Sequence, residues 1–253
     1  MSDTTSALPW ATGADQPASA SAIGLYARRT AGFEARLEAT VQALRQAAAE
    51  HPSQVVLANS LGAEDMVLTD LIARHQLPIA IGTLQTGALH EETLALVPRI
   101  EQRYGLKVEL YEPVQEAVVQ FVRDHGEKAM YESIALRKAC CQVRKLEPLG
   151  RMLEGRAAWV TGLRREQSGN RSAMPLREVE ANGRVKFNPL VDWTWADVWH
   201  HIAEHEVPYN VLRPVQASVI SSCVTKVRTQ FTNRSSCARN AAASARWSRW
   251  PAP

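Results

Sequence analysis

Two adjacent cysteines, Cys140 and Cys141, are the residues whose spacing most clearly indicates chemistry. Neighbours on a helix point about 100° apart, so both thiolates can bind a single object only if it is large, such as an iron–sulfur cluster. Lys138, Arg144 and Lys145 lie close by in the sequence and would favour the thiolate form. Taken alone, the pair is also compatible with two half-buried cysteines that pack as small hydrophobic side chains.

The segment SLGAED, residues 60–65, lies between a short apolar run and a predicted helix. The unpaired N–H groups and the dipole at a helix N-terminus attract phosphate or sulfate oxygens. Gly62 would let the backbone approach such a ligand, and the Ser60 hydroxyl would add a donor. The Gly-Lys-Ser/Thr ending of a Walker loop is missing, and an ordinary turn between strand and helix is the alternative.

The segment LQTG, residues 84–87, ends another predicted strand. Loops at the carboxyl ends of parallel strands are where α/β sheets bind ligands, and this one suits contact with a nucleoside. A simple Thr-Gly turn would have the same sequence. The candidate binding residues in this loop are Leu84, Thr86 and Gly87.

Two arginines, Arg164 and Arg165, follow a predicted strand at residues 157–162. Guanidinium groups form paired hydrogen bonds to phosphate or sulfate oxygens, so these arginines are candidate anion ligands at the edge of the sheet that holds SLGAED. The alternative is a pair of surface arginines whose charge is balanced by Glu166.

These segments are positioned by strands and helices that alternate along the chain. Apolar residues recur at helical spacing over residues 30–50, and Thr194 is a predicted N-cap for a Trp-rich helix that runs to Glu206. Strands are predicted at residues 55–58, 78–84, 107–113 and 157–162. The alternation predicts an α/β fold with a parallel sheet flanked by helices, and ligand-binding loops at the carboxyl ends of its strands.

The composition, with 45% hydrophobic and 22% charged residues in 253, is that of a globular protein and excludes collagen-like, coiled-coil and wholly disordered chains. No apolar run reaches the roughly 20 residues of a spanning helix, and the start lacks the pattern of a secretory signal. We therefore expect a cytoplasmic protein with no membrane or nucleic-acid partner. Residues 1–29 read as a flexible leader, because they are rich in small and polar residues.

Charge is unevenly distributed. Residues 1–206 hold 22 Lys/Arg and 26 Asp/Glu, a net charge of −4, whereas residues 207–253 hold seven Lys/Arg and no acid, a net charge of +7. A basic tail can bind phosphates, and a poorly ordered tail is the alternative.

Taken together, the motifs resemble the assimilatory adenylyl-sulfate reductases, the thioredoxin-dependent APS/PAPS reductase family. SLGAED, LQTG with HEET, CCQVRKLEPL, WVTGLRREQS, FNPLVDWTWADVW and VPYN occur in the family's order. The resemblance runs from about Phe33 to about Leu212 and implies one domain over residues 30–212. It implies a fold of the adenine-nucleotide alpha-hydrolase class, related to the ATP pyrophosphatases (PP-loop enzymes). The implied reaction converts adenylyl sulfate and a reduced dithiol partner, thioredoxin or a similar protein, into sulfite, AMP and a disulfide.

The resemblance also implies roles for individual residues. Cys140 and Cys141 would bind a [4Fe–4S] cluster together with a later Cys-x-x-Cys, and Cys223 lies near the place of the third ligand. A C-terminal cysteine would attack the substrate sulfur, and Cys237 is the candidate. Members with the cysteine pair usually prefer adenylyl sulfate over its 3′-phosphorylated form. The implied substrate-binding residues are Ser60, Gly62, Leu84, Thr86, Gly87, Lys145, Arg164 and Arg165.

The tail, residues 213–253, departs from the family. Neither the Cys-x-x-Cys nor the terminal Glu-Cys-Gly-Leu-His occurs in it. Four cluster ligands and one nucleophile require five cysteines, and the chain has four. We interpret the tail as a shifted reading frame or a degenerated terminus, and we expect impaired reductase activity. The alternatives are a non-catalytic adenine-nucleotide binder and an adenylating enzyme of the ATP pyrophosphatase type; a homo-oligomer is left open.

Overall fold

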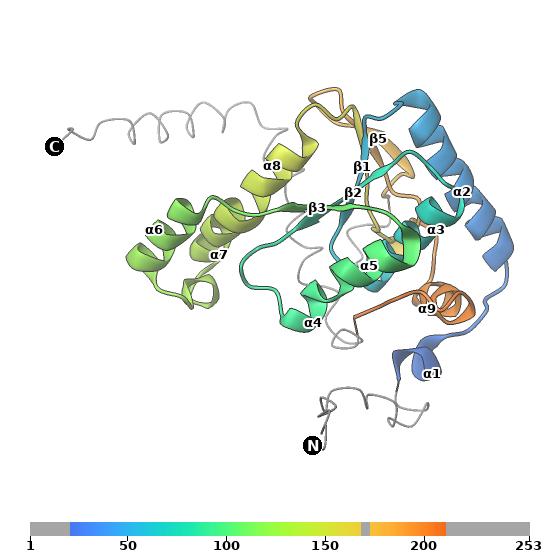
Figure 1. The fold of residues 1–253 in the computed structure, drawn as a ribbon, viewed down its shortest axis with the longest axis horizontal. Coiled ribbons are helices and arrows are strands. Elements are labelled where there is room, and N and C mark those ends of the chain that lie inside the picture. Colours follow the sequence, from blue (N-terminus) through green and yellow to red (C-terminus); the bar gives the residue numbers. More distant parts are fainter. Residues whose placement is uncertain (1–20, 168–172, 211–253) are drawn as a thin grey trace, which may run out of the picture.

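The computed structural model describes residues 21–167 and 173–210, which form a six-stranded sheet with helices on both faces (Figure 1). The strand order is β3-β2-β1-β4-β6-β5, and every neighbouring pair is parallel except β5 and β6. The predicted α/β class with a parallel sheet flanked by helices is confirmed. The strands are β1 (Val55–Asn59), β2 (Ala80–Leu84), β3 (Val108–Tyr111), β4 (Ala158–Val160), β5 (Arg177–Val179) and β6 (Val185–Phe187).

Alternate residues of the central strand β1 supply two hydrophobic layers. Val55 and Leu57 pack in the larger layer, whereas Val56 packs with Trp159 in a smaller layer on the opposite face. This division follows from the two-residue period of a strand. The larger layer is covered by α2 (Phe33–Glu50), α3 (Ala63–Arg74), α5 (Leu96–Tyr104) and α9 (Trp195–Glu204), and the smaller by α8 (Glu147–Leu153).

Part of the predicted flexible leader is helical. Helix α1 (Ala22–Tyr26) begins after Ser21, whose hydroxyl accepts a hydrogen bond from the Gly24 N–H at 3.1 Å. Ala22 is buried in the main core, and the Tyr26 ring lies 6.0 Å from that of Trp195. The leader prediction is therefore wrong for this segment, because its apolar residues pack against the body. Residues 1–20 of the leader and the predicted tail at residues 213–253 lie outside the described residues.

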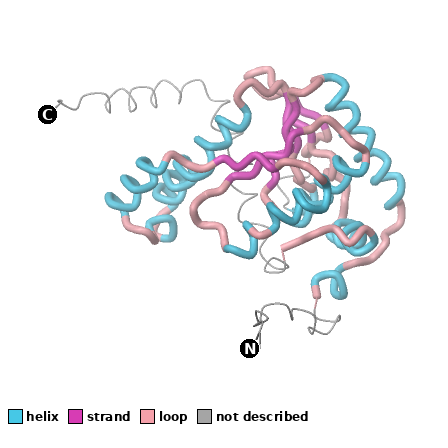
Figure 2. Tube along the Cα trace, in the orientation of Figure 1, coloured by secondary structure: helices cyan, strands magenta, loops and turns pink. Residues whose placement is uncertain are grey.

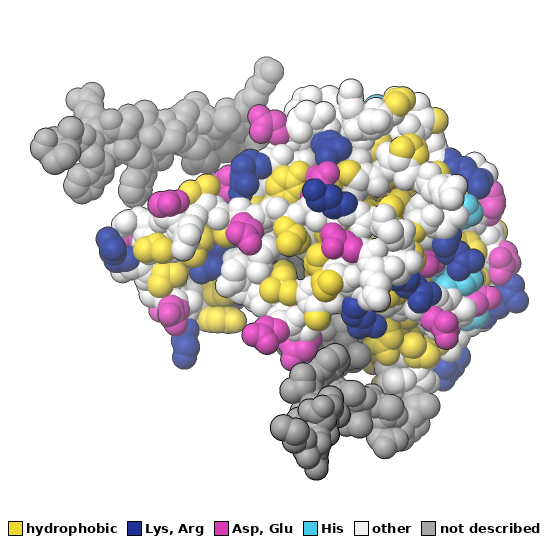
Figure 3. Space-filling model, in the orientation of Figure 1, with side chains coloured by type: hydrophobic (Ala, Val, Ile, Leu, Met, Phe, Trp, Pro, Cys, Tyr) yellow, Lys and Arg dark blue, Asp and Glu magenta, His cyan; other side chains and the backbone are white. Residues whose placement is uncertain are grey.

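An arm extends from the sheet beyond the edge strand β3 (Figures 1 and 2). It consists of α6 (Gln115–His125), the 3-10 turn η2 (Ala129–Tyr131) and α7 (Ile134–Cys141), and α6 contains no buried side chain. Figure 3 shows apolar and charged side chains interspersed over this arm. A short helix, α4 (Glu91–Leu94), precedes α5. Within the described ranges, none of the helices has the length and apolar character needed to cross a bilayer.

Candidate functional site

A pocket opens at the carboxyl ends of β1, β2 and β4, where the parallel sheet was predicted to bind its ligand. Its lining combines apolar and polar side chains, which suits a ligand that joins a flat ring to a charged group. The apolar lining consists of Ala58, Ala63, Leu84, Leu89, Leu149, Trp159, Leu163 and Trp195. The polar lining includes Asn59, Ser60, Glu64, Asp65, Thr86, Lys145, Thr161 and Gln167.

The loop after β1 is held by Asp65, in the first turn of α3. Ser60 donates its backbone N–H and its hydroxyl to Asp65 Oδ2, at 2.8 and 2.6 Å. Gly162, which follows β4, donates its N–H to Asp65 Oδ1 at 3.0 Å. Ser60 lines the pocket with its hydroxyl proton directed at Asp65, so its predicted contact with substrate stays a prediction.

Helix α3 begins directly after this loop, with Gly62 as its N-cap residue. No side chain in the described part of the chain caps this terminus, and Gly62 lines the pocket. Uncapped N–H groups and the helix dipole give this end of α3 a partial positive charge. The predicted anion-binding features are thus present beside two acidic residues, Glu64 and Asp65.

Asp65 is buried, with 7% of its surface exposed. Burial raises the pKa of this carboxyl to about 6, against the hydrogen bonds from Ser60 and Gly162, which lower it. The neighbouring charge of Glu64 also raises the pKa. At neutral pH the group is mostly ionised, so the pocket carries a buried negative charge of its own.

Lys145 approaches the pocket from the opposite side. It belongs to the π-helical turn η3 (Gln142–Leu146), which joins α7 to α8, and such turns often occur at functional sites. Lys145 lines the pocket and has neither a hydrogen bond nor an ion pair to any residue that the structure describes. Its ammonium group is therefore available to an anionic ligand.

The loop after β2 is fastened by Arg144, which precedes Lys145. Arg144 Nη1 donates to the Thr86 carbonyl oxygen at 2.9 Å. Gly87 has a φ of +71°, and a Cβ there would lie 3.1 Å from Arg144 Nη1, so a side chain would be strained and crowded. Leu84 and Thr86 line the pocket, whereas Gly87 lies beside it and shapes the turn.

Comparisons with known proteins identify the family. Residues 54–216 match the phosphoadenosine phosphosulfate reductase domain. The chain belongs to this family. Its relatives include an enzyme from Allochromatium vinosum named adenosine 5′-phosphosulfate reductase, which is 51% identical over 178 residues. That alignment covers 70% of this chain and 69% of the relative. The family predicted from the motifs is confirmed.

Solved structures support the assignment of the chain to this reductase family. The phosphoadenylyl-sulfate reductase of Candida auris, in a phosphate complex, aligns with a TM-score of 0.58 and 28% identity over 72% of this chain and 87% of that one. The NAD synthetase of Campylobacter jejuni aligns with a TM-score of 0.52 and 12% identity over 79% and 85%. The second likeness concerns the fold alone, and it agrees with the predicted adenine-nucleotide alpha-hydrolase class.

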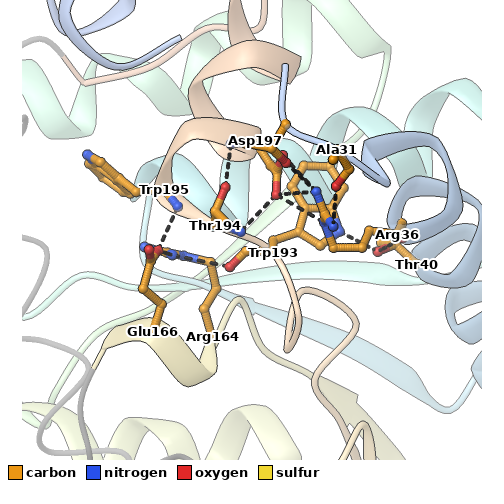
Figure 4. A network of polar contacts seen from close by, with 10 residues as sticks. Ala31, Arg36, Thr40, Arg164, Glu166, Trp193, Thr194, Trp195 and Asp197 are labelled. Carbon is orange, nitrogen blue, oxygen red and sulfur yellow. Dashed lines mark hydrogen bonds and ion pairs between the residues drawn. The ribbon is translucent and has the colours of Figure 1, made fainter. Parts of the chain in front are cut away.

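Arg164 of this reductase-family chain points at carboxylates of its own. Its guanidinium is buried, with Nε 3.1 Å from Glu64 Oε1. Nη1 donates to Glu166 Oε2 (Figure 4). The guanidinium plane also lies over the Trp195 ring, 5.2 Å from the centroid. Arg164 is not part of the pocket lining, so its predicted contact with an anion stays a prediction.

Arg165 lies farther from the pocket. It forms an ion pair with Asp192 and donates from Nε to the Met174 carbonyl oxygen at 3.1 Å. The alternative expected Glu166 as the balancing acid, but Glu166 pairs with Arg164, and Asp192 balances Arg165. No sequence pattern indicates that Asp192 would be the partner.

Two described cysteines close helix α7. Cys140 is buried and Cys141 is half-buried, with Lys145 in the turn that follows. Within residues 21–167 and 173–210, no group of three or more His, Cys, Asp or Glu side chains is arranged to hold a metal. The predicted metal ligand Cys223 and the predicted nucleophile Cys237 lie outside the described residues.

Sequence reasoning missed several pocket residues. Glu64 and Asp65 belong to the segment at residues 60–65 that the resemblance placed along the ligand, but no separate role was predicted for either acid. Gln167, which donates to Glu64 Oε1 at 2.9 Å, and Trp195 were also missed. The unexpected acidic pair in an anion loop was the available signal.

Proposed function

We propose that the chain reduces adenylyl sulfate to sulfite and AMP in the cytoplasm, with two electrons from thioredoxin or a similar dithiol protein. A cysteine thiolate attacks the sulfur and AMP leaves with the electrons of the broken S–O bond. One thiolate of the dithiol protein then attacks the cysteine sulfur, and sulfite leaves with the electrons of the broken S–S bond. The second thiol of the dithiol protein resolves this mixed disulfide, which restores the cysteine and leaves a disulfide in the dithiol protein. Support comes from membership in a family whose relatives are named for this substrate.

One observation carries the proposal: among the described lining residues Lys145 is the one Lys or Arg, its side chain has no partner in the described part of the chain, and it shares the pocket with apolar side chains and the uncapped N-terminus of α3. We place the adenine against Leu84, Leu149 and Trp159, because a flat ring gains from contact with apolar side chains. The phosphosulfate then lies between Lys145 and the N-terminus of α3, where both charge and N–H donors favour it.

The remaining predicted substrate-binding residues do not bind the phosphosulfate in this proposal. Ser60, Gly62, Thr86 and Gly87 shape the loops around the nucleotide. Arg164 and Arg165 would reach the substrate only by leaving their present acidic partners, so we assign the anion to Lys145 ahead of them.

The proposal includes a [4Fe–4S] cluster. Cys140 and Cys141 are thiolate ligands of the kind that iron prefers, and the cations that follow them offset the cluster's negative charge. Cys140 and Cys141 fit half of a four-thiolate ligand set, and Cys223 would be the third ligand, which leaves Cys237 as the attacking cysteine. When bound, the cluster supplies a polarisable, redox-capable group close in sequence to Lys145.

We also propose that turnover is impaired. If Cys237 binds the cluster, no cysteine is left to attack sulfur; if it attacks, the cluster has at most three thiolates. The family match ends at residue 216, so both later cysteines lie beyond it. This count is the observation that favours the second candidate function, a non-catalytic adenine-nucleotide binder.

The deciding experiment measures sulfite released from adenylyl sulfate with thioredoxin, for this chain and for the Allochromatium vinosum relative. We expect this chain to bind adenylyl sulfate and to turn over orders of magnitude more slowly, because positioning of the nucleophile supplies much of the rate. Turnover equal to the relative's that disappears in Cys237→Ser would contradict the impairment and identify Cys237 as the nucleophile. Binding with no sulfite at all would favour the non-catalytic binder.

The proposed role of Lys145 has its own test. Lys145→Ala should weaken adenylyl-sulfate binding by about 1.5–3 kcal/mol, because a hydrogen bond from a charged donor is lost. Isothermal titration calorimetry measures the change. The matched control is Lys138→Ala, an exposed cation on α7 that does not line the pocket. Equal affinities of the Lys145 variant and the parent would remove Lys145 from the site.

A further inference from the structure

The pocket contains a buried carboxylate that the proposed reaction does not use. Asp65 lies where an anionic substrate is expected, and its charge opposes such a substrate. Its two oxygens accept three hydrogen bonds, from the Ser60 N–H, the Ser60 hydroxyl and the Gly162 N–H, at 2.6 to 3.0 Å. Those donors are of the kind that would otherwise hold an external oxyanion.

The three hydrogen bonds join three elements. Asp65 belongs to the first turn of α3, Ser60 follows β1, and Gly162 follows β4, the strand that pairs with β1. Beyond the paired residues Leu57 and Val160 the two strands no longer share a ladder. The carboxylate therefore continues the connection between them where the backbone pairing has ended.

The contact with the β4 loop is unusually close. A Cβ at position 162 would lie 2.3 Å from Asp65 Oδ1 and 2.9 Å from the Glu64 Cβ. A side chain at this position would push the β4 loop away from α3. Gly162 is thus the residue that lets the carboxylate reach the backbone of this loop.

We propose that Asp65 is a positioning residue, which acts as a fixed internal anion and sets the spacing between the N-terminus of α3 and the β4 loop. This inference rests on the proposed function, because the two walls it spaces are those of the proposed nucleotide pocket. Substrate does not touch Asp65 in this arrangement. Removal of the carboxylate lets the walls separate, and nucleotide affinity falls.

Charged side chains from three elements lie near Asp65. Glu64 lies on the same helix and is paired with Arg164 from the β4 loop, and Lys145 faces the pocket from η3. Protonated Asp65 offers an O–H in place of one acceptor, so a donor at Ser60 or Gly162 loses its partner. Since burial raises the Asp65 pKa to about 6, affinity for adenylyl sulfate should fall as the pH drops through about 6.

The test compares Asp65→Asn with Asp70→Asn in the full chain. Asp70 is a buried acid on the same helix, but it faces His201 and Tyr104 instead of the pocket. The measurements are adenylyl-sulfate affinity across pH and amide hydrogen exchange at Ser60 and Gly162. Asp65→Asn should weaken adenylyl-sulfate binding on the order of tenfold to a hundredfold at neutral pH, as expected for misplaced binding groups. The fall in affinity near pH 6 should be absent from this variant. The substitution should also speed exchange at both amides.

The control should lose thermal stability while it keeps parental affinity and exchange at Ser60 and Gly162. Unchanged exchange at these two amides in Asp65→Asn would overturn the inference. A parent that at neutral pH binds adenylyl sulfate no more tightly than Asp65→Asn would overturn it as well. If the parent fails to bind adenylyl sulfate at all, the proposed function fails, and amide exchange alone then decides whether Asp65 holds the two loops together.

Discussion

Asp65 and Asp70 lie on one helix and are both buried, yet their pKa values move in opposite directions. Burial dominates at Asp65 and raises its pKa to about 6. Burial also opposes ionisation of Asp70, but the hydrogen bond and charge of His201, with the Tyr104 hydroxyl, hold its pKa below the ordinary value. The ionised carboxylate therefore destabilises the fold at Asp65, beside the pocket, and stabilises it at Asp70, beside α9.

Stability as a function of pH should separate the two acids. A raised pKa in the folded state contributes stability at low pH that is lost as the pH rises through about 6, so ionised Asp65 costs about 3 kcal/mol at neutral pH. As the pH falls from about 7 to about 4, the free energy of unfolding of the parent should therefore rise relative to that of Asp65→Asn. Urea unfolding at several pH values measures both.

Asp70→Asn should show the opposite trend. Its lowered pKa contributes stability above the unfolded value, which is lost as the pH falls below about 4. We expect the variant to be less stable than the parent by about 1–3 kcal/mol at neutral pH, with the difference shrinking in acid. A constant difference across the pH range would contradict this account.

Alanine substitutions of the neighbouring Arg164 and Arg165 should lower the free energy of unfolding by very different amounts. Arg164→Ala leaves Glu64 buried, at 5% exposure, without its cation, and loss of one partner of a buried ion pair costs about 3–5 kcal/mol. Arg165→Ala breaks a more exposed pair with Asp192 and should cost less than about 1 kcal/mol. Guanidinium chloride unfolding of both variants, without ligand, checks the contrast. Similar costs at the two positions would contradict the assigned partners.

At the scale of elements, a capping box and several side-chain hydrogen bonds hold the start of α9. Thr194 and Asp197 form a capping box, as the predicted N-cap at Thr194 requires, and Arg36 donates two hydrogen bonds to the Asp197 carboxylate (Figure 4). The Thr30 hydroxyl adds another, at 2.5 Å. The segment before α2 is thereby fastened to the helix that places Trp195 in the pocket wall.

Two substitutions at this junction should differ in size. Thr194→Ala removes a cap and should cost about 1 kcal/mol. Arg36→Met leaves the fully buried Asp197 side chain without its cation and should cost about 3 kcal/mol or more. Thermal and urea unfolding give both values. A larger loss from Thr194→Ala than from Arg36→Met would show that the cap, and not the ion pair, holds the junction.

Much of this framework could be predicted from sequence, because helices with apolar stripes and short apolar strands carry periodic signals. The antiparallel pair β5 and β6 was missed, since strands of three residues each are too short to show a period. The sequence of residues 136–154 predicts one continuous helix, whereas the structure divides the segment into α7, the π-helical turn η3 and α8. Such a turn depends on what its residues contact, and Lys145 reaches the pocket through it.

The site was predictable in part for the same reason. The rule that parallel sheets bind ligands at their carboxyl edge brought three of the loops to one place, and Ser60, Gly62, Leu84, Thr86 and Lys145 do line the pocket. The orientation of Arg164 was not predictable, because its partner Glu64 lies far away in the sequence. Pairing of distant charges has no local signature.

At the scale of the whole molecule, the cysteine pair ends an arm that carries little buried surface. If Cys140 and Cys141 hold a cluster, Cys140→Ser should remove its visible absorbance and its iron, because a hydroxyl is a poor iron ligand beside thiolates. Iron analysis and absorbance after anaerobic reconstitution measure this. Iron content equal to the parent's would remove the cluster assignment, whatever the sulfite assay shows.

The tie between Arg36 and Asp197 also bears on the order in which the chain can fold as it is made. The two residues are 161 positions apart in the sequence. The central strand β1 likewise pairs with β4, which is synthesised about 100 residues later. A nascent chain that has released only its first half from the ribosome exposes one unpaired side of β1 and the uncovered apolar stripe of α2. Contacts so distant are slow to form, and exposed strand edges invite association with other chains. We therefore expect this protein to depend on chaperones during synthesis until α9 has emerged.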